Sequence, residues 1–197
     1  GISYLVIDME AAGIEIRPLV QITGEAEFNE VFLDQVFVPA DHLVGELDAG
    51  WAVANTTLAH ERGTNFPFKE QVVHEVFLEE LYCLADELGT LRDPEVSEQL
   101  ATAFIQLRLL KLHNWRTLTR LSHGEEPGPE SSYIKLAWTE MTQQMSAAAL
   151  DVLAESSPLV GPWQRQYLWS MAASIAGGTS EIQKTIIGDR ILGLPRS

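Results

Sequence analysis

The stretch AGGTSEIQKTIIGDR, residues 176–190, decides the fold of the chain's C-terminal part. Two glycines lead into a helical pattern, and Ser180 followed three residues later by Gln183 fits the capping box that begins a helix. N–H groups in a first helical turn point outward with the positive end of the dipole, so the place suits a phosphate or another anion. The alternative is a simple loop-to-helix junction, because capping boxes are common.

From Gly50 onward the sequence predicts helices, because apolar residues recur with a period near 3.6. The expected helices are 51–88 with a kink or interruption at Pro67, one from Asp93-Pro94 to Gly124, one from Glu130 to Ser156, 164–174 and 180–192. Three long helices and two shorter ones predict an antiparallel bundle. The apolar stripes, Met141 and Met145 among them, are expected in the core, and the five tryptophans in the core or a subunit interface.

The first 47 residues have a different pattern. Segments 2–8, 14–20 and 30–38 are rich in Val, Ile and Phe and are predicted to be strands, followed by a loop from Asp34 to Asp48. We therefore expect a partial β domain at 1–47 and a helical-bundle domain at 48–197. The chain opens on an apolar strand without an initiator Met or a leader, so we expect a fragment whose missing half carries part of the site.

Composition excludes several classes of function. The 46% hydrophobic content is ordinary for a soluble globular protein. The formal net charge of −15 argues against binding to nucleic acid or to an anionic membrane surface. No apolar run approaches the length of a transmembrane helix, and the single Cys83 fits a reducing cytoplasm.

Four pieces of the chain, in order, carry a resemblance to one family. Gly24–Asp34 resembles the end of a middle β domain, Val38–Glu46 with Gly50-Trp51 the link to a first helix, Leu58–Arg62 an active-site turn, and residues 176–190 a C-terminal signature. The family is the acyl-CoA dehydrogenases. The resemblance implies a mainly α fold, with an antiparallel bundle preceded by strands of an incomplete β domain. It also implies FAD as cofactor and oxidation of an acyl-CoA to its 2,3-enoyl-CoA.

Glu61 is a candidate catalytic residue. It shares a helical face with Ala54, Leu58 and Phe68, where a buried carboxylate is costly unless it is compensated. It either pairs with a Lys or Arg across the bundle or acts as a general base in a pocket whose apolar walls raise its pKa. In many family members the base directly precedes Gly-Thr in the signature, which here is Gly177. In others it precedes the arginine of the first helix, so the resemblance implies that Glu61 is the α-proton base.

The resemblance also implies the binding residues. Arg62 takes the place of an arginine that contacts CoA, although a surface salt bridge is as compatible with the sequence. Gly178, Thr179 and Glu181 take places that contact the nucleotide half of FAD. Glu181 is a weaker candidate for the base, because a helix start stabilises its charge and keeps its pKa down. No metal site is expected.

Two segments depart from the family pattern. Leu88–Pro94 lacks an Arg-x-x-Phe-Gly run, and Asp151–Ser157 lacks a Gln-x-x-Gly-Gly-x-Gly run, so two cross-subunit flavin contacts are in doubt. The alternatives are a non-catalytic partner subunit of a heteromeric acyl-CoA dehydrogenase, or an acyl-CoA oxidase. The expected partners are an electron-transfer flavoprotein and other subunits, in a homotetramer or dimer or in a heterotetramer with a related subunit.

Overall fold

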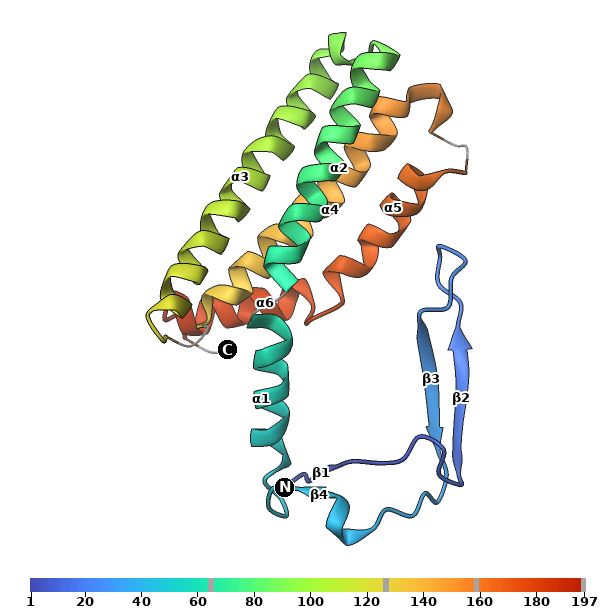
Figure 1. The fold of residues 1–197 in the computed structure, drawn as a ribbon, viewed down its shortest axis with the longest axis vertical. Coiled ribbons are helices and arrows are strands. Elements are labelled where there is room, and N and C mark those ends of the chain that lie inside the picture. Colours follow the sequence, from blue (N-terminus) through green and yellow to red (C-terminus); the bar gives the residue numbers. More distant parts are fainter. Residues whose placement is uncertain (64–65, 126–127, 158–159, 196–197) are drawn as a thin grey trace. The chain divides into compact units, whose positions relative to one another are not determined.

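The structure is a computed structural model that describes residues 1–63, 66–125, 128–157 and 160–195, except the side chains of 59–63 and of 66–67. The chain divides into two compact units, Gly1–His60 and Glu61–Ser197 (Figure 1). The domain boundary expected between residues 47 and 48 stays a prediction.

The first unit contains two small antiparallel pairs of strands and the start of a helix. The strands are β1 (Tyr4–Leu5) paired with β4 (Leu43–Val44), and β2 (Ile14–Leu19) paired with β3 (Phe28–Leu33). A 3-10 turn, η1 (Ala40–His42), precedes β4, and α1 spans Gly50–Gly63. The strand expected at 2–8 is therefore only two residues long, the one expected at 30–38 lies at 28–33, and the loop expected at 34–48 contains η1 and β4.

The β2–β3 hairpin gathers apolar side chains on one face. Ile14 pairs with Leu33 and Ile16 with Val31, so these four side chains lie on one side of the hairpin. All four are exposed or only half-buried. Among residues 1–58, whose side chains are described, Gly50 alone is buried, so this unit has no interior of its own there.

The second unit is the expected helical bundle. Its helices are α2 (Phe66–Leu88), α3 (Pro94–Ser122), α4 (Glu130–Leu153), α5 (Pro162–Ser170) and α6 (Ser180–Ile186). The central helix is α4, which contacts all four others (Figure 1). The largest fully buried apolar side chains are Leu81, Met141, Met145 and Val152, which confirms the core positions expected for Met141 and Met145.

Local sequence explains where the long helices begin and end. The Asp93 carboxylate accepts a hydrogen bond of 2.9 Å from the Glu95 N–H, and Pro94 occupies the first helical position of α3. Gly89, with φ of 74°, follows α2 in a conformation that favours glycine. The helix expected at 51–88, with a kink or interruption at Pro67, corresponds to α1 and α2. Pro67 is the second residue of α2, where the N–H it lacks has no helical partner to lose.

The last helix begins one residue earlier than the capping box indicates. The cap is Thr179 and not Ser180, because the Thr179 hydroxyl accepts from the Ile182 N–H at 3.3 Å. The helix expected at 180–192 is α6 followed by a π-helix, η5 (Ile187–Ile191).

Several apolar positions of the expected stripes are not in the core. Phe104, Trp115 and Leu118 on α3 are about half exposed, and Ala137 on α4 is exposed. Of the tryptophans, Trp138 is buried, whereas Trp51 is exposed. Within the described ranges, no helix combines the length and apolar character needed to cross a membrane.

Candidate active site

The predicted base lies in the last turn of α1. The backbone of Glu61 and Arg62 is helical, and Gly63 ends the helix. Their side chains fall outside the described part of the chain, so the roles expected for the Glu61 carboxylate and the Arg62 guanidinium stay predictions.

Gly177 offers space instead of a carboxylate. Its φ of 65° lies in the left-handed region that favours glycine. A Cβ built on it would meet a single neighbouring atom, Cε of Lys135, at 4.0 Å, which is an ordinary van der Waals distance. The place where many family members carry their base is therefore empty of a side chain and open.

Side chains from two helices fix the backbone that leads to Gly177. The ammonium group of Lys135 on α4 donates to the Ala173 carbonyl oxygen at 2.8 Å, and the Thr139 hydroxyl lies 3.0 Å from the same oxygen. From α6, the Gln183 amide donates to the carbonyl oxygens of Gly177 at 2.9 Å and Gly178 at 3.3 Å. Lys135 and Gln183 are both buried. We call these bonds the signature brace, because they hold the segment 173–178 from both sides.

Thr179 and Glu181 form a polar cluster at the open start of α6. The Glu181 carboxyl accepts hydrogen bonds from the backbone N–H of Glu181 and from the Thr179 hydroxyl, and these bonds hold its pKa below the ordinary value. The charges of Lys184 and Lys135 lower this pKa further. A carboxylate with a lowered pKa is a weaker proton acceptor. This favours a binding role for Glu181 over the role of base.

Sequence reasoning missed Lys135 and gave Gln183 only a place in a capping box. A signal for Lys135 exists in the spacing of polar residues on α4, which recur at intervals of three and four and are all buried: Ser132, Lys135, Thr139, Thr142 and Ser146. A polar stripe of this kind in a helix of the core indicates buried hydrogen-bonding partners. The identity of those partners, such as the Ala173 carbonyl, is not contained in the stripe itself.

The two segments that depart from the family pattern are short 3-10 turns here. Thr90–Arg92 forms η2 between α2 and α3, and Ala154–Ser156 forms η3 at the end of α4. Ala154 has φ of 49° and ψ of −120°. The backbone thus has a glycine-type conformation at a place where the sequence lacks the glycine.

Comparison with known proteins identifies the family. The model of the acyl-CoA dehydrogenase C-terminal domain matches residues 48–192. The chain belongs to the acyl-CoA dehydrogenase family. Over its whole length it is 38% identical to the acyl-CoA dehydrogenase IpdE1 of Mycobacterium tuberculosis and 36% identical to FadE34 of the same organism. It spans 51% of the length of IpdE1 and 27% of that of FadE34.

Solved structures of acyl-CoA dehydrogenases share the fold. The whole chain superposes on a chain of the ChsE4-ChsE5 complex from Mycobacterium tuberculosis with a TM-score of 0.83, at 27% identity and over 54% of that chain. It superposes on a chain of the Tcur3481-Tcur3483 steroid ACAD with a TM-score of 0.85, at 22% identity and over 53% of that chain. Both are assemblies of two different subunits.

FAD is the cofactor of this family, and the described residues fit it. Gly177 and Gly178 both have positive φ and bring bare backbone to the surface, so a flat ligand can approach closely. Next to them, Thr179 and the exposed Glu181 offer a hydroxyl and a carboxylate, which suit the hydroxyl groups of a ribose. The ionised Glu181 does not suit a phosphate, so the nucleotide sugar is the better match.

Proposed function

We propose that the protein carrying this chain oxidises an acyl-CoA thioester to its 2,3-enoyl-CoA with FAD, and that Glu61 is the α-proton base. The observation that carries the proposal is the open space at Gly177. A family member without a carboxylate at that place needs a proton acceptor from another element, and Glu61 on α1 is the acid that directly precedes an arginine there.

In this proposal the Glu61 carboxylate accepts the proton from Cα of the thioester. The electron pair left on Cα forms the Cα–Cβ double bond as a hydride leaves Cβ, so the substrate loses two hydrogens in total. FAD, when bound, supplies the acceptor for that hydride. Arg62 binds the phosphate groups of CoA, and Gly178, Thr179 and Glu181 hold the nucleotide half of the cofactor. The signature brace keeps Gly177 and Gly178 in place, so that bound substrate and cofactor stay aligned with the base.

The experiment that tests the base is anaerobic bleaching of the flavin absorbance by acyl-CoA. In Glu61→Gln the amide cannot take up the proton, so we expect reduction to slow by about 10²–10⁴-fold while acyl-CoA still binds. Glu181→Gln is the matched control and should keep the wild-type reduction rate per bound flavin. Normal bleaching in Glu61→Gln, or loss of bleaching in Glu181→Gln at full flavin content, would reject Glu61 as the base.

A second candidate function is a non-catalytic subunit of a heteromeric acyl-CoA dehydrogenase. Two observations favour it, namely the sequence of the two segments that departs from the family's flavin-contacting runs and the two-subunit assemblies among the similar structures. This candidate predicts that Glu61→Gln leaves the activity of the assembled complex unchanged. It also predicts that a change of the corresponding acid in the partner subunit abolishes that activity.

The electron acceptor separates a dehydrogenase from an oxidase. We propose an electron-transfer flavoprotein as the partner that reoxidises the reduced enzyme. After anaerobic bleaching, addition of this partner should restore the yellow colour within the turnover time, whereas air should restore it slowly. Rapid recovery in air alone would instead identify an acyl-CoA oxidase.

A further inference from the structure

Lys135 is a buried lysine on α4 whose side chain meets the segment 173–178 at two places. The residue is 6% exposed. Its ammonium group donates to the Ala173 carbonyl oxygen at 2.8 Å, and its Cε lies 4.0 Å from the position that a Cβ would take on Gly177. One side chain therefore holds the start of the segment and also lines the open space at Gly177.

Of the two donors near the Ala173 carbonyl oxygen, the Lys135 ammonium is the stronger. The Thr139 hydroxyl lies 3.0 Å from this oxygen, but it also lies 2.9 Å from the Lys135 carbonyl oxygen of its own helix. A hydroxyl has a single proton, so it cannot donate fully to both oxygens. An ionised donor also makes a stronger hydrogen bond than a neutral one. The main bond to Ala173 is therefore that of Lys135.

The segment between Ala173 and α6 is exposed, and buried side chains hold it only at its two ends. Ala173 is 1% exposed, whereas residues 175–177 are exposed. At the far end, the buried Gln183 amide donates to the carbonyl oxygens of residues 177 and 178. These two residues are consecutive glycines, which have many conformations open to them unless other groups fix the backbone. The place of Gly177 thus depends on both ends, and Lys135 holds the first of them.

We propose that Lys135 is a positioning residue for the acyl-CoA site. Through the Ala173 carbonyl it holds Gly177 in the place that leaves the space beside it open to the acyl group. Without the ammonium the segment shifts, and the bound thioester is no longer aligned with the base. The proposal rests on the proposed function, because that function assigns this space to the substrate. A misplacement of about 1 Å can slow a reaction by about 10²-fold.

A positioning role and a purely structural role predict opposite effects on stability. An apolar side chain of similar size in place of a buried charge is often neutral or stabilising, because the charge no longer has to be taken out of water. In Lys135→Met the Thr139 hydroxyl still reaches the Ala173 carbonyl oxygen. The methionine also keeps a Cε beside Gly177, so the lining of the open space is preserved and only the ammonium is removed. The midpoint of urea unfolding should therefore equal or exceed that of wild type.

Hydrogen exchange measures whether Lys135 holds the segment. The N–H groups of Ile175 and Ala176 both donate to the Ala172 carbonyl oxygen, at 3.0 and 2.9 Å, just after the 3-10 helix η4 (Met171–Ser174). In Lys135→Met these two amides should exchange at least about tenfold faster than in wild type, whereas the amides in the middle of α4 should keep their rates.

Reduction of the flavin by acyl-CoA measures whether this position matters for the reaction. At full flavin content and saturating acyl-CoA, the limiting reduction rate of Lys135→Met should fall by about tenfold, because the substrate is bound but misaligned. Thr139→Val removes the weaker donor alone, so its effects on exchange and on reduction should both be smaller than those of Lys135→Met.

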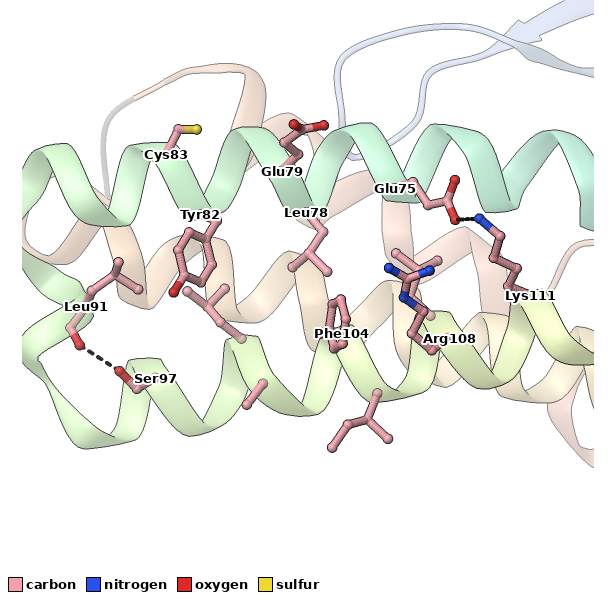
Figure 2. A pocket seen from close by; sticks show the side chains of 14 residues that line it. Glu75, Leu78, Glu79, Tyr82, Cys83, Leu91, Ser97, Phe104, Arg108 and Lys111 are labelled. Atoms are coloured by element: carbon pink, nitrogen blue, oxygen red, sulfur yellow. Dashed lines mark hydrogen bonds and ion pairs between the residues drawn. The ribbon is translucent and has the colours of Figure 1, made fainter.

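The same substitution elsewhere in the bundle is the matched control. Lys111 on α3 lines an open groove of about 830 Å³ between α2 and α3, and it donates to the Glu75 carboxylate at 2.8 Å (Figure 2). Neither Lys135 nor the segment 173–178 lines that groove. Lys111→Met should therefore keep the wild-type exchange of Ile175 and Ala176 and the wild-type limiting reduction rate.

Three results overturn the proposal. The first is unchanged exchange at Ile175 and Ala176 in Lys135→Met, because the segment is then held without the ammonium. The second is faster exchange with an unchanged limiting reduction rate. The third is a Lys135→Met protein that is less stable than wild type or does not fold, because Lys135 then serves stability. A failure of Glu61 as the base would appear in Glu61→Gln and would leave the exchange result unaltered, so the two proposals fail separately.

Discussion

Ala154, the residue after α4, has a backbone conformation that costs energy for any residue with a Cβ. Its φ of 49° and ψ of −120° belong to a region that glycine adopts readily and alanine does not. The family pattern to which this segment was compared has a glycine at this place, and the chain forms the turn with alanine instead. The surrounding helix end therefore holds strained backbone in place.

Ala154→Gly should relieve this strain and stabilise the protein. We expect the free energy of unfolding to rise by about 1 kcal/mol, because the strain removed exceeds the extra entropy of glycine in the unfolded chain. Urea denaturation measures the change. Ala137→Gly is the control within the same helix, at an exposed position, and should lower stability by about 1 kcal/mol. A loss of stability in both variants would show that residue 154 is not strained.

Part of the candidate site could be predicted from single residues. The sequence indicates Gly177, Gly178, Thr179 and Glu181, because they are adjacent in one motif and the structure places them together at the start of α6. It does not reveal that Lys135 and Gln183 hold this motif. Lys135 acts on a carbonyl 38 residues away, and a contact at that separation depends on how α4 packs. For the same reason, local spacing cannot decide between Ser180 and Thr179 as the cap.

For the helices, local sequence determines where each one begins and ends, but it does not determine which face is buried and which is exposed. Asp93 and Gly89 mark limits that could be predicted. The stripe that contains Leu107 and Phe104 could not be divided from sequence, because Leu107 is buried in the bundle whereas Phe104 is half exposed. Both faces contain apolar residues with a helical period, and periodicity does not say which neighbour covers them.

The contact between α2 and α4 contains a buried histidine. His74 Nδ1 lies 2.7 Å from the Glu70 carbonyl oxygen, and its Nε2 lies 2.9 Å from the Thr142 hydroxyl. Burial lowers the pKa of His74 below its ordinary value of 6.5, although the Glu70 carbonyl and carboxylate oppose the shift. The neutral ring is therefore the form that the α2–α4 contact holds.

This histidine predicts a dependence of stability on pH. Above pH 6.5 the ring is neutral in the folded and the unfolded chain and contributes no penalty. As the pH falls below 6.5, the unfolded chain takes up a proton that the folded one does not, so stability decreases until the pH passes the lower folded pKa. Between pH 7.5 and 5.5, His74→Gln should lose less unfolding free energy than wild type in urea titrations.

His123→Gln is the control for that titration, because His123 is exposed at the end of α3. The unfolding free energy of this variant should change with pH as that of wild type does. If wild type and His74→Gln lose the same unfolding free energy between pH 7.5 and 5.5, His74 is not the source of the acid sensitivity.

In the molecule as a whole, the two units differ in how many of their residues are buried from solvent. The described side chains of residues 1–58 include one buried residue, whereas the bundle has a continuous core that includes Leu81, Met141 and Val152. Local opening is easiest where few apolar contacts must break. The two units should therefore open independently.

Hydrogen exchange measures this difference in a protein of these 197 residues. Backbone amides of β2 and β3 should exchange at least about 100-fold faster than those in the middle of α4, relative to their intrinsic rates. The Leu81→Ala variant should speed exchange in α4 and leave the hairpin unchanged. Equal protection of hairpin and α4 would mean that the hairpin is covered to the same extent as the bundle.

The π-helix at Ile187–Ile191 has a consequence for sequence alignment. A π turn accommodates one residue more than an α turn over nearly the same axial rise. A homologue with a single deletion between Ile187 and Gly193 can thus continue α6 as a regular helix and still bring its tail to the same end point. A one-residue gap in this stretch is therefore compatible with an unchanged fold, and the residues on either side of it remain equivalent.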